Sequence, residues 1–330
     1  MVDPNHNAQR PDHQGPVIRL GISRCLLGES VRYDGGHKRD PFLTNELGRY
    51  VEWVPVCPEV EMGLPVPRES MRLVGDPANP RLVAPKSGID YTERMVAWAR
   101  ARADQLAGEK LHGFVFKKDS PSSGLFRVKV YNEHGIGERN GVGMFAREVA
   151  RRFPLLPLEE EGRLNDMPLR ENFIERVFAY YRLTEMLTQE STPGGLVKFH
   201  TAHKMTLMAH SPKHYTEMGR LVADAGTRKW KDLTAEYGAR FMEGLGVMGT
   251  PGKHVNVIQH LMGFLKNDLS SEDKQELLSL IEDYRLGLLP LIVPLTLLKH
   301  HLNRYPMPEW VQQQVYLYPY PKELMLRNHV

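Results

Sequence analysis

The feature that most constrains the fold is an apolar run that ends on a cysteine and opens into a glycine-rich loop. Residues 17–22 are mostly apolar and lead to Cys25, and the loop beyond contains Gly28, Gly35 and Gly36. This pattern predicts a buried β-strand that places Cys25 at its carboxyl end.

The same pattern occurs twice more along the chain. Residues 54–56 lead to Cys57, and the apolar run 113–116 leads to a Ser-Pro-Ser-Ser-Gly turn at 120–124. Ligands of an open parallel sheet bind beyond the carboxyl ends of its strands. We therefore expect the three loops to meet at one crevice.

The segments between these strands predict the fold class. Residues 92–110 have helical spacing, a strand is expected at 127–131 and a further helix at 143–153, whereas 58–85 is expected to be a loop. Strands that alternate with helices form a parallel sheet. We therefore predict an α/β domain over residues 17–155, with an open, Rossmann- or flavodoxin-like parallel sheet.

The second half of the chain has a different character. Residues 156–170 contain prolines and a Glu-Glu-Glu run and are expected to be a linker, and 171–330 an all-α accessory domain. The polar segment 1–16 is expected to be a disordered tail. Helical periodicity occurs at 173–187, 196–210, 215–225, 233–245, 254–267, 272–286 and 295–305.

Composition limits the compartment and the partners. Two cysteines in 330 residues argue against a disulfide scaffold and favour a reducing cytoplasm. No apolar run reaches the roughly 18 residues that a membrane span needs, so no membrane partner is expected. No obligate protein partner is evident. The net charge of +3 names no partner, although the basic, histidine-rich stretch 196–232 leaves RNA contact open.

Cys25 and Cys57 allow several kinds of site. They are either buried core thiols, which is the ordinary role of lone cysteines, or ligands. A structural zinc site usually has four ligands in closely spaced pairs, and a redox pair usually has C-x-x-C spacing, neither of which occurs here. Histidines could still complete a zinc site. An iron–sulfur cluster held by fewer than four cysteines is the other option, and its open iron would act as a Lewis acid.

Glu59 and the serines are candidates for catalysis. Glu59 follows Cys57 closely, where a carboxylate can transfer the proton that water attack requires, or it pairs with Arg68 at the surface. Ser120 and Ser122 either orient a substrate carbonyl or satisfy the backbone of the turn.

Four residues are candidates for substrate binding. Asp34 and His37 in the glycine loop either hold a base or ribose or take part in turn formation. Arg32 and Lys117 are candidates for binding an anion or sulfide near the cysteines.

Two sets of polar residues share helix faces in the second half. They are His200, His203 and Lys204, and Asn256, Gln259 and His260. The first set suits a metal or phosphate and the second a base edge, at i, i+3 and i+4 spacing. The plainer interpretation is a solvated face for the first and a buried polar network for the second.

Three ordered motifs resemble the bacterial thiouracil desulfidase family. They are Cys-Leu-Leu-Gly-x-x-Val-Arg-Tyr-Asp-Gly-Gly at 25–36, Val-Pro-Val-Cys-Pro-Glu with Gly-Leu-x-x-Pro-Arg at 54–68, and Lys-x-x-Ser-Pro-Ser-x-Gly at 117–124. The helical half resembles a domain fused to this family in many bacteria. The fused form is similar to desulfidases that act on 4-thiouridine.

The resemblance implies a [4Fe-4S] cluster on three cysteines. Its fourth iron would take sulfur from a thiocarbonyl to give a [4Fe-5S] species, and water would complete the conversion of C=S to C=O with release of sulfide. Cys25 and Cys57 match two ligands, whereas Ser123 stands where the family motif Ser-Pro-Ser-Cys-Gly has the third.

With Ser123 as the third donor we expect the cluster to be lost or labile in this chain, because an alcohol is a harder and weaker donor than a thiolate. The serine marks either a deliberate replacement, which we favour because its neighbours keep the family pattern, or natural divergence. The leading hypothesis is a desulfidase of thiolated uracil or 4-thiouridine with an absent or labile cluster. The alternatives are a non-catalytic nucleotide- or RNA-binding protein and a zinc or thiol protein. Free base, nucleoside and tRNA all remain open as substrates.

Overall fold

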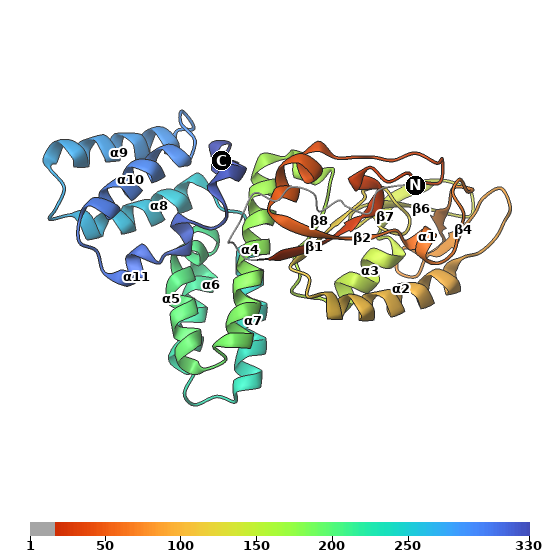
Figure 1. Ribbon diagram of the computed structural model, residues 1–330, viewed down its shortest axis with the longest axis horizontal. Coiled ribbons are helices and arrows are strands. Elements are labelled where there is room, and N and C mark those ends of the chain that lie inside the picture. The colour runs from red at the N-terminus through yellow and green to blue at the C-terminus, as the bar shows by residue number, and fades with distance from the viewer. Residues whose placement is uncertain (1–16) are drawn as a thin grey trace. The chain divides into compact units, whose positions relative to one another are not determined.

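The computed structural model describes residues 17–330, so the tail predicted at 1–16 lies outside the described residues. The chain divides into two compact units between Asn165 and Asp166. Figure 1 shows strands and helices in the first unit and helices throughout the second. This arrangement confirms the predicted fold class, an α/β part followed by an all-α part.

The main sheet of the first unit has four parallel strands in the order β2-β1-β5-β8. They are β1 (Ile18–Ser23), β2 (Val51–Val56), β5 (Gly113–Phe116) and β8 (Leu158–Glu160). The apolar side chains of β1 and β5 are buried, as expected for central strands covered on both faces.

Two helices of this unit, α2 (Thr92–Leu106) and α3 (Met144–Arg152), lie side by side (Figure 1). The ring of Phe114 on β5 packs directly on the backbone of Gly21 in β1, where an added Cβ would overlap it. The Phe114 ring in turn lies 5.8 Å from that of Phe145 on α3. The missing side chain therefore lets an aromatic cluster fix the helix to the sheet.

The predicted linker at 156–170 is wrong in its first part, because strand β8 lies within it and joins the main sheet. Glu160 accepts the backbone N–H of Leu125 at 2.7 Å, and Glu161 accepts that of Lys118 at 2.7 Å. These acidic residues are buried because they satisfy backbone donors of a neighbouring loop, a role that their charge does not reveal in the sequence.

A second, mixed sheet has the order β4-β3-β6-β7. Its strands are β3 (Arg72–Val74), β4 (Arg81–Val83), β6 (Val128–Tyr131) and β7 (Gly137–Gly141). The strand expected at 127–131 is confirmed as β6. The loop expected at 58–85 is wrong where β3 and β4 form, because each has only three residues and buries a single leucine, too little to give a periodic signal.

The second unit consists of helices and short turns. Its helices are α4 (Met167–Gln189), α5 (Pro193–His210), α6 (Pro212–Ala223), α7 (Trp230–Gly246), α8 (Pro251–Met262), α9 (Ser271–Arg285), α10 (Ile292–Arg304) and α11 (Glu309–Gln312). Five begin after a side chain that accepts the N–H three residues further on. These capping residues are Asp166, Thr192, Ser211, Thr250 and Ser270.

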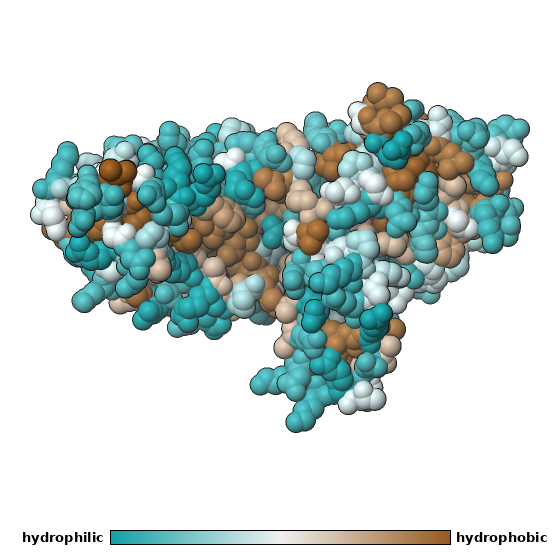
Figure 2. All heavy atoms as spheres, turned by 180° about the vertical axis from the view of Figure 1, so that it is seen from behind, coloured by the Kyte–Doolittle hydropathy of each residue, from teal (hydrophilic) through white to brown (hydrophobic). Residues whose placement is uncertain are grey.

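The surface in Figure 2 is largely hydrophilic, with apolar residues in separate patches. Between residues 17 and 330, none of the helices combines the length and the hydropathy that crossing a bilayer requires.

Candidate active site

The three predicted loops meet at one cavity of about 400 Å³ in the α/β unit. Strands β1 and β2 are in register up to the pair Ser23 and Val56, so their carboxyl ends are level and the loops begin at the same edge. The predicted site residues that line this cavity are Cys25, Arg32, Cys57, Glu59, Lys117, Ser120 and Ser123.

Both cysteines are free thiols at the buried end of the cavity. Cys25 is 9% exposed and Cys57 is 6% exposed. Burial raises the pKa of Cys25 to about 11, against the attraction of the Lys117 and Arg32 charges. Burial and the Glu59 carboxylate raise the pKa of Cys57 to about 12. The two thiols are therefore protonated at neutral pH in the protein alone.

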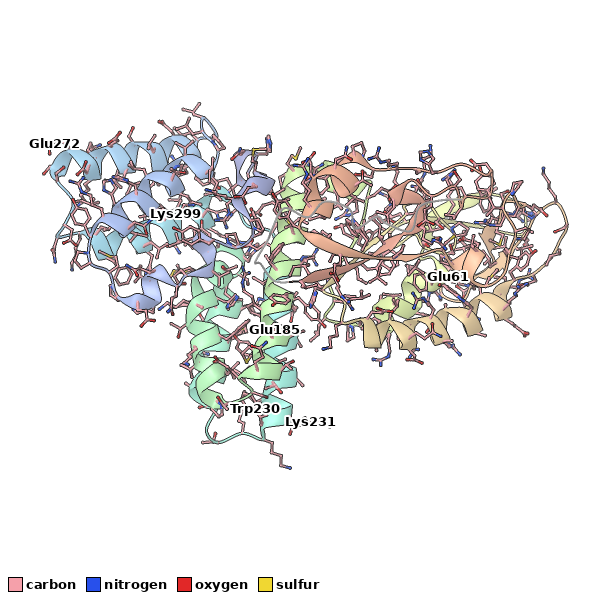
Figure 3. The ribbon with its side chains drawn as sticks, viewed as in Figure 1. Glu61, Glu185, Trp230, Lys231, Glu272 and Lys299 are labelled. Atoms are coloured by element: carbon pink, nitrogen blue, oxygen red, sulfur yellow. The ribbon has the colours of Figure 1, made fainter. Side chains whose placement is uncertain are left out.

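The loop that carries Cys57 is fixed by the short helix α1 (Pro58–Glu61). The backbone N–H of Cys57 donates to Oε1 of Glu61 at 3.0 Å. Oε2 of the same carboxylate pairs with Nε of Arg102 on α2 at 3.1 Å. Glu61, labelled in Figure 3, thus ties the cysteine loop to the long helix of the unit.

Glu59 is held by three groups inside the site. Ser122 Oγ donates to its Oε1 at 2.6 Å, and Cys57 Sγ donates to its Oε2 at 3.6 Å. The guanidinium of Arg68 lies 3.6 Å from Oε2, so the predicted pairing with Arg68 exists, although it is buried. A carboxylate fixed in this way at a cavity wall can accept a proton from a bound water.

The serine loop packs against the start of α3. The Oγ atoms of Ser120 and Ser122 lie 3.0 Å apart, and Ser120 Oγ accepts the backbone N–H of Ser123 at 3.1 Å. A Cβ at Gly143 would overlap the backbone of Ser122. Ser120 and Ser123 line the cavity, whereas Ser122 is fully buried and reaches it through Glu59.

Lys117 is positioned by two residues that sequence reasoning missed. Its Nζ forms an ion pair with Glu161 next to β8, and its backbone N–H donates to Ser23 Oγ at 2.9 Å. Ser23 ends β1 and also lines the cavity. Ser23 could have been found in the sequence as a polar residue at the end of a buried strand. Glu161 could not, because it lay in the predicted linker.

Asp34 and His37 are not among the residues that line the cavity. Asp34 accepts the N–H of Gly36 at 3.0 Å and pairs with Arg32, and Nδ1 of His37 accepts the N–H of Arg39 at 3.2 Å. Both side chains are exposed and take part in local turns. Asp34 contacts the cavity residue Arg32, but neither Asp34 nor His37 itself reaches the cavity.

The donor set does not fit the cluster that the family resemblance implies. A [4Fe-4S] cluster with an open iron takes three thiolates, and the cavity offers the thiols of Cys25 and Cys57 and the alcohol of Ser123. An alcohol is too hard and too weakly acidic to replace a thiolate on equal terms. Across residues 17–330, no three His, Cys, Asp or Glu side chains are grouped to hold a metal ion.

Neither polar helix face of the second unit matches its plainer interpretation, which was a solvated face for the first set and a buried polar network for the second. His200 and His203 on α5 are buried at 9% and 2% exposure, so this face is not solvated. They contact the hydroxyl of Tyr237 and the carbonyl of Phe199, respectively. The second set, at positions 256, 259 and 260 on α8, is exposed and forms no buried network.

Comparisons with known proteins agree with the division of the chain. Residues 20–161 match the model of the 2-thiouracil desulfurase family, and residues 204–321 match DUF1722, a family of unknown function. The chain is 32% identical over 156 residues to the uncharacterized protein YbgA of Escherichia coli (strain K12), covering 46% of this chain and 90% of YbgA.

Among solved structures, the chain is similar to the [4Fe-4S]-dependent thiouracil desulfidase TudS. The identity is 28% and the TM-score 0.37, with 46% of this chain and 97% of the other covered. From the sequence matches, the chain belongs to the 2-thiouracil desulfurase family, with a DUF1722 region in its helical unit.

Proposed function

We propose that the α/β unit is a desulfidase scaffold for thiolated uracil or 4-thiouridine, in which Ser123 removes one ligand of the family's cluster. The reaction exchanges the sulfur of a thiocarbonyl for the oxygen of water and releases sulfide. The observation that carries the proposal is the meeting of two thiols, a fixed carboxylate and the serine loop at one cavity within the matched region.

The part of Glu59 in this reaction is proton transfer. Water must form a bond from its oxygen to the thiocarbonyl carbon and lose two protons, and the C–S bond must break so that sulfur leaves as hydrogen sulfide. A carboxylate that accepts the first of these protons makes water a better nucleophile. Ser122 and Arg68 hold Glu59 in place for this step.

Ser120 and the cationic residues bind and orient. Ser122 Oγ gives its only proton to Glu59, so Ser120 Oγ donates to Ser122 Oγ at 3.0 Å. Ser120 lines the cavity and accepts the Ser123 N–H, and in this arrangement it holds the serine loop and Ser122 in place beside the substrate. Arg32 and Lys117 line the same cavity, and their charges lower the pKa of Cys25 against the larger effect of burial. The same charges favour the departing sulfide anion.

The test is to restore the third thiolate. After anaerobic reconstitution with iron and sulfide, Ser123→Cys should gain a broad absorbance near about 400 nm and release sulfide from 4-thiouridine or 2-thiouracil, because three soft donors can hold the cluster. Ser30→Cys, which adds a thiol at an exposed serine that does not line the cavity, is the matched control and should gain neither property.

The second candidate function is binding of a nucleotide or RNA without catalysis. Ser123 itself favours it, because the site as it stands lacks a cluster ligand. An iron-loaded Ser123→Cys protein that turns over none of the thiopyrimidines would favour this function over the desulfidase.

A further inference from the structure

One aromatic side chain lies at the outer part of the cavity. Tyr33 is 45% exposed, and it is the single aromatic residue in the cavity lining, all of which lies in the described part of the chain. The inner part is buried, with Cys25 at 9% and Ser123 at 3% exposure. The cavity therefore passes from a polar, thiol-bearing floor to a rim that carries an aromatic ring.

The backbone beneath this ring is fixed. The N–H of Gly35 donates to the carbonyl of Arg32 at 3.0 Å, which closes the loop into a turn, and Gly35 has the positive φ that the turn needs. The N–H of Arg68 donates to the carbonyl of Tyr33 at 2.8 Å, and its Nη1 donates to that of Val31 at 3.0 Å. The tyrosine is thus exposed on a loop with little freedom to move.

The ring itself also has a partner. The guanidinium of Arg32 lies 5.5 Å from the centroid of the Tyr33 ring, and it pairs with Asp34. A cation over an aromatic ring restricts its rotation. Exposure of a single large side chain needs no ligand to explain it. The observation that points to a ligand is the place of this ring, on a fixed loop in the lining of the cavity that carries both thiols.

We infer that Tyr33 determines substrate specificity by stacking on the pyrimidine ring while the thiocarbonyl faces the floor of the cavity. This inference rests on the proposed function and names the feature of the substrate that is recognised. Stacking depends on the planar π system rather than on which ring carbon carries sulfur. The site should accept both 2-thio and 4-thio pyrimidines and exclude thiourea, which has a thiocarbonyl but no ring.

The test measures binding without turnover, in the full chain with Ser123 in place. Ligand-observed NMR titrations give the dissociation constants of uridine and uracil, the oxygen-containing products. Tyr33→Ala should weaken binding about 10-fold or more, since stacking of one base on an aromatic ring typically contributes between about 5-fold and 150-fold in affinity. Tyr33→Phe should stay within about threefold of the parent, because the ring is kept.

The control is Tyr318→Ala in the helical unit, which removes a tyrosine of similar exposure, 54%. It should leave both constants unchanged. The inference is overturned if Tyr33→Ala binds within twofold of the parent, if Tyr33→Phe loses as much as the alanine variant, or if the parent binds neither ligand. These outcomes are separate from the desulfidase test, because binding that depends on Tyr33 can be present in a chain whose Ser123→Cys variant never releases sulfide.

Discussion

At the scale of single residues, Glu59 carries the sharpest prediction about chemistry. In the Ser123→Cys background, Glu59→Gln keeps the shape of the side chain and its contact with Ser122 but removes the base. Turnover of 4-thiouridine should fall at least about 100-fold, because general-base help is typically worth about 10² to 10⁴ in rate. Cluster absorbance and KM should change little, and both are measured on the same preparation.

Glu138→Gln serves as the control, because Glu138 is an exposed acid on β7 outside the cavity. Its turnover should equal that of the background protein. A loss below about fivefold for Glu59→Gln would contradict the assigned role and would leave the proton transfer to Ser120 and Ser122.

The site residues that were predictable from the sequence are those that directly follow a predicted strand. Cys25 and Cys57 both follow apolar strands, and the level ends of a parallel sheet bring such residues together. Asp34 and His37 lie in the same loop as Arg32 but satisfy backbone N–H groups of their own turn. A short-range turn contact and a contact to substrate use the same residue types, so the sequence alone does not separate them.

At the scale of elements, the helices of the second unit were predicted correctly in kind but begin earlier than the apolar periodicity indicates. The helix expected from residue 196 begins at Pro193 after the cap Thr192, and the one expected from residue 254 begins at Pro251 after Thr250. The first turn of these helices is polar or proline-containing, so it adds nothing to the apolar pattern. A capping residue followed by proline was the stronger signal for the start.

The buried histidines of these helices predict acid sensitivity. Burial lowers the pKa of His203 on α5 to about 3, and that of His254 on α8 to about 3. In the unfolded chain a histidine titrates near 6.5. Between these values only the unfolded state binds the protons, so stability is full at neutral pH and is lost as pH falls from about 6.5. The urea midpoint of the chain should therefore be lower at pH 5 than at pH 7.5.

His203→Gln tests this at one position. His203 donates from Nδ1 to the carbonyl of Phe199 at 2.8 Å, and its Nε2 has no partner among the described residues, so a charge there would be uncompensated. The variant should reduce the stability difference between pH 7.5 and pH 5 by about 2 kcal/mol. His134→Gln, at an exposed histidine, should leave the difference as it is. An unchanged difference in His203→Gln would show that other groups cause the acid sensitivity.

At the scale of the whole molecule, the order of an α/β part and an all-α part was predictable, because runs of alternating strands and helices give way to helices alone. The division between Asn165 and Asp166 falls within the linker predicted at 156–170, but the first part of that stretch belongs to the α/β unit. The acidic, proline-containing stretch at 156–170 has the composition of a linker, yet it supplies a strand of the main sheet and acceptors for buried N–H groups. These partners are more than 30 residues away in sequence, and only the folded chain brings them to Glu160 and Glu161.

The division between Asn165 and Asp166 predicts how the α/β unit tolerates truncation. A chain ending at residue 165 keeps β8, whereas one ending at residue 155 leaves an edge of β5 unpaired. The shorter chain also loses the carboxylates that accept N–H groups of Leu125, Phe126 and Lys118. Each hydrogen bond to a charged acceptor contributes about 1.5 to 3 kcal/mol to stability. The combined loss is therefore comparable with the free energy of unfolding of a whole domain, typically about 5 to 15 kcal/mol.

We therefore expect the fragment 1–165 to unfold in one cooperative urea transition, and the fragment 1–155 to show none. Glu160→Gln and Glu161→Gln in the longer fragment separate the carboxylates from the strand, and each should lower the midpoint while keeping the transition cooperative. Because Glu161 also holds Lys117 at the cavity, its variant should in addition weaken uridine binding, whereas the Glu160 variant should not. A fragment 1–155 as stable as 1–165 would show that β8 is dispensable and that the site is complete before residue 156.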